Sequence, residues 1–108
     1  KQMQQVLLNI LINAAQAMPN GGALFVRSRQ RGANQVEIEI QDTGEGIPKE
    51  HLGKIFDPFF TTKLEKKGTG LGLSVVYSIV VKHHGTIHVQ SQVSAGTTFT
   101  LRLPRAAP

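Results

Sequence analysis

The architecture follows from Val36-Glu37-Ile38-Glu39-Ile40-Gln41-Asp42-Thr43-Gly44-Glu45-Gly46. Strict alternation of apolar and polar residues predicts a half-buried strand over 36–42. Asp42 shares the parity of the apolar residues, so its carboxylate should point to the covered side of the sheet. A buried carboxylate needs a partner, and the missing side chains of Gly44 and Gly46 would let a flat ligand with an amine, such as a purine, approach. The alternative is an Asx turn before Gly44.

Other segments supply the rest of a small α+β domain. Residues 24–30 alternate before a turn at 31–34, which predicts a second half-buried strand antiparallel to 36–42, with Arg27 and Arg29 facing Glu37 and Glu39. Two further strands, 86–91 and 97–103, form a closing hairpin. Apolar helices are expected over 2–18 and from 71 to about 83, the latter capped by Gly85.

The first predicted helix carries a stripe of uncharged amides, and its members are Gln2, Gln5, Asn9, Asn13 and Gln16. Asn9 and Asn13 lie one helical turn apart. A stripe exposed to solvent would more often consist of Lys and Glu than of uncharged amides. Mg²⁺ takes few protein oxygens besides water and phosphate, so one Asn carbonyl can complete its shell. The alternative is a polar helix face packed under a loop.

Residues 44–70 show no regular apolar period and are rich in Gly, Pro, Thr and Lys. One short helical turn is expected within them, near 49–55. A loop of this length inside a compact domain is usually a functional lid or else the sign of a mistaken element assignment. Phe56-Asp57-Pro58-Phe59-Phe60 places half of the aromatic residues there, where a covered ligand would bury them. Lys63 either contacts phosphates or is simply a solvent-exposed residue of the loop.

Gly68-Thr69-Gly70-Leu71-Gly72-Leu73 leads directly into the second helix, so free backbone N–H groups at a helix N-terminus are available to phosphate. The alternative is a flexible hinge. The glycine spacing does not fit a dinucleotide fingerprint, and no Walker A pattern is present.

Composition narrows the function. The 108 residues contain no cysteine, which excludes disulfides, thiolate metal sites and a thiol nucleophile. The net charge of +5 suits a polyanion, but the basic residues are scattered, so nucleic acid is disfavoured. Apolar runs are too short to cross a membrane. The chain starts within an apparent helix, and we expect it to be a piece of a longer protein.

Taken in order, four segments resemble the boxes of sensor histidine kinase catalytic domains, within the GHKL or Bergerat-fold ATPases and a nitrogen-regulation-like subgroup. Residues 5–14 look like the asparagine box, 42–48 the first glycine box, 56–59 the phenylalanine box and 68–73 the second glycine box; 96–99 resembles a further glycine motif. The resemblance implies a two-layer α/β sandwich, with a mixed sheet, helices on one face and an ATP lid. It also implies one domain over 1–108 that lacks the phosphoacceptor domain and the first strand.

By this resemblance Asp42 binds the adenine amine, Asn13 ligates Mg²⁺, and Asn9 contacts the phosphates. Asn9 and Lys63 are the expected catalytic residues, and Asn13 is the expected metal ligand. The residues expected to contact ATP are Asn9, Asn13, Asp42, Gly44, Gly46, Ile47, Phe56, Gly68, Thr69, Gly70, Leu71, Gly72, Leu73 and Thr97.

The resemblance implies transfer of the γ-phosphoryl from Mg-ATP to a histidine of a separate dimerisation and phosphotransfer domain, and through it signalling to a response regulator. ATP-hydrolysing relatives carry Glu at position 9, and Asn9 cannot act as their base. None of His51, His83, His84 or His88 has an acceptor context, so the chain alone should not label itself. We expect a cytoplasmic location, with the parent protein anchored in the inner membrane. The alternatives are an ATP-binding module without transfer and an anti-sigma-factor-type serine kinase.

Overall fold

The computed structural model describes residues 2–57 and 72–105. In chain order, its elements are helix α1 (Gln2–Gln16), strands β1 (Leu24–Arg31) and β2 (Gln35–Asp42), the 3-10 turn η1 (Lys49–His51), helix α2 (Gly72–Lys82), and strands β3 (Thr86–Gln92) and β4 (Gly96–Pro104). The helices and strands match the sequence-based segments closely, because each has a strong apolar period of its own. None of the helices described is long and apolar enough to span a bilayer.

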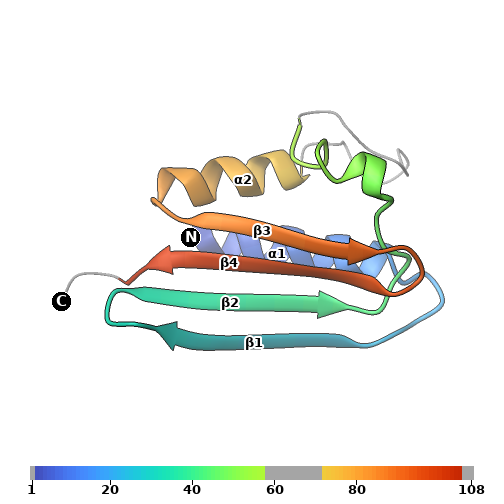
Figure 1. Ribbon diagram of the computed structural model, residues 1–108, viewed down its shortest axis with the longest axis horizontal. Coiled ribbons are helices and arrows are strands. Elements are labelled where there is room, and N and C mark those ends of the chain that lie inside the picture. Colours follow the sequence, from blue (N-terminus) through green and yellow to red (C-terminus); the bar gives the residue numbers. More distant parts are fainter. Residues whose placement is uncertain (1, 58–71, 106–108) are drawn as a thin grey trace.

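The four strands form one sheet in the order β1-β2-β4-β3, with all three pairings antiparallel (Figure 1). The α+β sandwich is therefore confirmed, whereas the expected mixed sheet is wrong for the strands described. The connection through α2 carries the chain from β2 to β3, which run in the same direction. However, β4 returns between them, so these two strands never pair.

Both helices cover one face of the sheet (Figure 1). The core forms where their apolar sides meet the inward residues of β2 and β4. Its buried members are Val6, Ile10, Ile40, Ile55, Val76, Ile79, Val80, Phe99 and Leu101. This burial supplies the main stabilisation of the fold.

Strand β1 lies at the edge of the sheet, away from both helices (Figure 1). All eight of its residues are exposed, including Leu24 at 43% and Val26 at 58% on the side that should have been covered. The prediction that β1 is half-buried is therefore wrong. Its alternation is real, but neither helix extends over it.

The other face of the sheet carries a charged cluster around Glu37, which is only 6% exposed. Arg29 and Arg31 contact this carboxylate at 3.1 Å each, and Arg102 does so from β4, also at 3.1 Å. Burial alone would raise the pKa of Glu37, but hydrogen bonds from Arg102 and Arg31 and the charge of Arg29 outweigh it and hold this pKa below its usual value. The predicted pairing of Arg29 with Glu37 is confirmed, as is that of Arg27 with Glu39 at 2.9 Å.

Helix α2 ends in a Schellman arrangement, with Gly85 N–H bonded to Val80 O and His84 N–H to Val81 O. The residue in the left-handed conformation is His84, with φ of 63°, and not Gly85 as expected. The predicted cap is therefore displaced by one residue.

Candidate functional site

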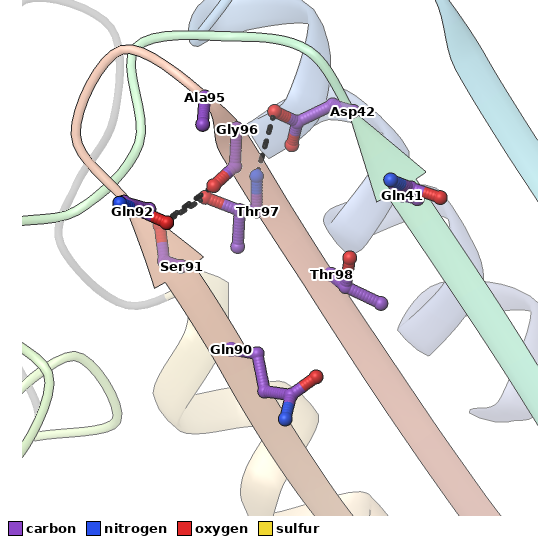
Figure 2. Close-up of a pocket in the computed structure, with 9 residues that line it drawn as sticks. All are labelled: Gln41, Asp42, Gln90, Ser91, Gln92, Ala95, Gly96, Thr97 and Thr98. Atoms are coloured by element: carbon purple, nitrogen blue, oxygen red, sulfur yellow. Dashed lines mark hydrogen bonds between the residues drawn. The ribbon is translucent and has the colours of Figure 1, made fainter.

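Asp42 ends β2 on the helix side of the sheet and is 3% exposed, as the alternation predicted. Its Oδ1 accepts hydrogen bonds from Gly44 N–H at 2.8 Å and from Thr97 N–H at 3.3 Å; Figure 2 shows the second. The bond from Gly44 is the Asx-type contact that the sequence left open as an alternative. Neither bond uses Oδ2, which has no hydrogen-bond partner within residues 2–57 and 72–105. One oxygen of a nearly buried carboxylate is therefore available to a further donor.

The loop after Asp42 is fixed by backbone contacts at both sides. Glu45 N–H bonds to Ala17 O at 3.0 Å, just beyond the end of α1, and Glu45 O accepts from Ser94 N–H at 2.7 Å in the β3–β4 turn. A Cβ at Gly44 would meet the carbonyl oxygen of Ala17, and one at Gly46 would meet that of Gln92. Protein backbone thus fills the space that the sequence assigned to a ligand, and ligand contact at these glycines stays a prediction.

Ser91, near the end of β3, links this loop to β4. Its Oγ accepts a hydrogen bond from Ile47 N–H at 2.7 Å. The same oxygen lies 3.0 Å from Gly96 O and 2.8 Å from Thr97 Oγ1, on residues that Figure 2 shows. Thr97 is 5% exposed and is the residue paired with Asp42 across the sheet. The loop, β3 and the carboxylate therefore belong to one hydrogen-bonded network.

Ser91 was not among the residues selected from the sequence, although a signal was present. It has the inward parity of Ile87 and Val89, and is thus a polar residue on an apolar face. The same signal led to Asp42. A hydroxyl is a weaker sign than a carboxylate, because it costs less to bury and can bond to nearby backbone.

The amide face of α1 meets the start of α2. Asn9 Nδ2 donates a hydrogen bond to Gly72 O at 3.3 Å, which joins the asparagine box to the second glycine box. Asn13 is half-buried one turn further along α1. The structure therefore brings together two segments that are 63 residues apart in the chain. Of the other expected residues, Lys63, Gly68, Thr69, Gly70 and Leu71 lie outside the part of the chain described.

The donor chemistry on α1 fits Mg²⁺ in one specific way. Among the described residues, no three His, Asp or Glu side chains gather as a metal site. Mg²⁺ bound with a nucleotide needs only one or two protein oxygens, since water and phosphates supply the others. The amide oxygen of Asn13 meets this requirement, because its side chain has no hydrogen-bond partner in the described ranges.

Phe56 does not stand free as part of an exposed aromatic loop. It is half-buried, packs against the core, and has its ring centroid 5.4 Å from that of Tyr77 on α2. Leu73 and Ile47 are also partly buried against this core. Contact of these three side chains with a ligand stays a prediction.

A separate open hollow of about 210 Å³ lies where β2 and β3 end and β4 begins (Figure 2). Gln41, Gln90 and Thr98 line it from the face of the sheet that points away from the helices. Asp42, which also borders it, has the opposite parity. The hollow therefore differs from the predicted nucleotide site between the sheet and the helices.

A sheet covered on one face by helices, with an inward carboxylate and an asparagine facing the second helix, places the chain among the two-layer α+β sandwiches. Within this class, the chain belongs to the family described as "Histidine kinase-, DNA gyrase B-, and HSP90-like ATPase", which matches residues 1–107. It is a domain of the histidine kinase type, because its relatives are sensor kinases. The nitrogen-regulation-like subgroup is not confirmed.

Three known proteins illustrate the similarity. Sensor histidine kinase ZraS of Escherichia coli (strain K12) is 50% identical over 103 residues, which cover 95% of this chain and 22% of ZraS. A solved mycobacterial sensor histidine kinase, MprB, has a TM-score of 0.86 and 34% identity over 98% of this chain and 74% of that one. Full-length ShkA in complex with AMPPNP has a TM-score of 0.82 and 25% identity, covering 99% of this chain and 22% of ShkA. The chain spans less than a quarter of the length of the curated sensor kinases that it matches.

Proposed function

We propose that this chain, over residues 1–108, binds Mg-ATP between its sheet and its helices and transfers the γ-phosphoryl to a histidine of a separate domain. The observation that carries the proposal is Asp42, a carboxylate 3% exposed whose Oδ2 has no partner among the described residues. A carboxylate so placed favours a ligand that donates a hydrogen bond, because an unpaired buried charge is costly. The exocyclic amine of adenine is such a donor.

The contact between Asn9 and Gly72 supports a phosphate site at the start of α2. The free N–H groups of a helix N-terminus favour anions, and the Asn9 amide lies next to them. Asn13, on the same side of α1, would hold Mg²⁺. The ion would neutralise phosphate charge as the γ-phosphoryl departs. Lys63, Gly68, Thr69, Gly70 and Leu71 complete the proposed site from the intervening segment.

Asn9 also favours transfer to an amino-acid side chain over hydrolysis. The hydrogen bond to Gly72 O uses an amide N–H, which an ionised Glu at this position could not donate. An amide likewise cannot deprotonate water. The γ-phosphoryl is thus preserved for a better nucleophile, such as an imidazole, and catalysis consists mainly of positioning and charge neutralisation.

The relatives support the partners we propose. ShkA was solved with AMPPNP, and ZraS is a sensor histidine kinase. By analogy, the acceptor histidine lies in a dimerisation and phosphotransfer domain of the same parent protein, and a response regulator receives the phosphoryl next. We place this domain in the cytoplasm, with membrane anchoring left to other parts of the parent.

Calorimetric titration with ATP and AMPPNP, with and without Mg²⁺, tests the nucleotide site. We expect Asp42→Asn to weaken ATP binding at least about tenfold, because an amide N–H₂ in place of Oδ2 would face the purine amine. Glu39→Gln is the matched control, since it removes a carboxylate from the opposite face of the same strand. A folded Asp42→Asn variant that binds ATP like the wild type would contradict the proposal.

A second assay separates transfer from simple binding. The chain is mixed with radioactive ATP and a separately produced acceptor domain from a sensor kinase. We expect label on that domain that is lost in acid, as phosphohistidine is. Acid-stable label would indicate a serine kinase of the anti-sigma-factor type, and ATP binding without label would indicate a binding module.

A further inference from the structure

Two hydrogen bonds of different kinds link the loop that follows Asp42 to the β3–β4 hairpin. Ser94 N–H donates to Glu45 O at 2.7 Å, and this bond joins backbone to backbone. Ile47 N–H donates to Ser91 Oγ, also at 2.7 Å. Of these two bonds, the second depends on a side chain. The identity of residue 91 therefore decides whether this second attachment exists.

The same hydroxyl also reaches β4, the strand whose Thr97 N–H bonds to Asp42. Ser91 Oγ lies 2.8 Å from Thr97 Oγ1 and 3.0 Å from Gly96 O. A hydroxyl has one proton and two lone pairs, so Ser91 can accept from Ile47 N–H and from Thr97 while donating to Gly96 O. Three segments therefore meet at one oxygen atom.

Asp42 depends on two of these segments. Its Oδ1 is held by Gly44 N–H, from the loop, and by Thr97 N–H, from β4. The 3.3 Å bond from Thr97 is the longer of the two and more easily lost. A shift of the loop relative to β4 would therefore rotate the carboxylate and change the direction of Oδ2.

We propose that Ser91 is a positioning residue for purine recognition. Its hydroxyl holds Ile47 and Thr97 in fixed positions relative to each other. In this arrangement Oδ2 of Asp42 points toward the purine amine. This role rests on the proposed function, because it assumes that Asp42 binds the base. If Ser91 only stabilised the fold, its loss would weaken the binding of all nucleotides equally. If Ser91 positions Asp42, its loss should instead reduce the preference for adenine over guanine. Guanine carries a carbonyl where adenine carries its amine.

A pair of variants with nearly the same shape tests this role. Ser91→Thr keeps the hydroxyl, and Ser91→Val replaces it with a methyl group of similar size. ATP and GTP dissociation constants are measured by calorimetry on the full chain. We expect Ser91→Val to weaken ATP binding about tenfold, equivalent to about 1.4 kcal/mol, the size of one net hydrogen bond. GTP binding should change little, so the preference for ATP should fall by a similar factor, and Ser91→Thr should retain most of it.

Amide hydrogen exchange without nucleotide provides a second measurement. Ser91→Val should speed exchange at Ile47 and Thr97 and leave Val26 and Leu101 unchanged. Ser28→Ala, in an exposed position on β1, is the control for loss of a strand hydroxyl. A folded Ser91→Val chain that keeps both its ATP preference and its slow exchange would overturn the role of Ser91. So would equal weakening of ATP and GTP. Failure of the folded wild type to bind ATP would instead contradict the proposed function itself.

Discussion

Arg102 Nε donates a hydrogen bond to Glu37 Oε1 at 3.1 Å, directly across the pairing of β2 with β4. The same carboxylate also meets Arg29 and Arg31 from β1. Glu37 therefore joins three adjacent strands on the face that the helices leave uncovered. Removing it would leave three guanidinium groups close together without their shared anion.

We expect Glu37→Gln to lower the free energy of unfolding at neutral pH. The pKa of Glu37 is depressed in the folded state, so its stabilisation is fully present above the unfolded value of about 4.3 and is lost as the pH falls through the lower folded value. Urea unfolding at pH 7 and near pH 3 should therefore show a difference between wild type and variant that shrinks on acidification. Glu39→Gln, which breaks one arginine contact, should have the smaller effect at pH 7. A constant difference at both pH values would contradict the expectation.

Substitution of isoleucine by valine at two places in α1 should separate buried from exposed positions. Ile10 is fully buried, whereas Ile12 is 46% exposed. Ile10→Val should cost about 0.5–1.5 kcal/mol, because it removes a methylene from a packed core. Ile12→Val should stay within about 0.5 kcal/mol of the wild type. Chemical denaturation of both variants checks this, and equal costs would show that α1 packs differently.

Alanine at two glycines should show how much the loop after Asp42 depends on close backbone contact. Gly32 and Gly46 both have positive φ, at 68° and 77°. A Cβ at Gly32 meets nothing within 4 Å, whereas one at Gly46 would meet backbone atoms of Gln92 and Val93. Gly32→Ala should cost about 1–2 kcal/mol for its conformation alone. Gly46→Ala should lower the stability clearly more, and thermal unfolding of both variants would show this. A similar loss of stability in the two variants would mean that the loop after Asp42 shifts readily to make room for the added Cβ.

The elements of this fold could be predicted from sequence because each is encoded by residues close together in the chain. The inward direction of Asp42 follows from two-residue alternation, and both helices follow from their apolar faces. Contacts between distant segments could not be read in this way. The exposure of β1 depends on where the helices lie, and the bond between Ile47 and Ser91 joins residues 44 positions apart. The alternation along β3 shows that Ser91 is a polar residue on an apolar face. Its hydrogen-bond partners, however, can be identified only in the folded structure.

We expect the isolated chain to bind ATP without phosphorylating any of its own histidines. His83 and His84 follow α2, at the opposite end from Gly72, and a helix of 11 residues is about 16 Å long. His83 Nδ1 is also 2.9 Å from Ile79 O, and His88 lies on the face of the sheet away from Asp42. Incubation with radioactive ATP, followed by electrophoresis at alkaline pH to preserve phosphohistidine, should leave the chain unlabelled. An added acceptor domain labelled in the same tube is the positive control. Stable label on the chain itself would require a histidine within reach of the γ-phosphoryl, and so a different position for the nucleotide.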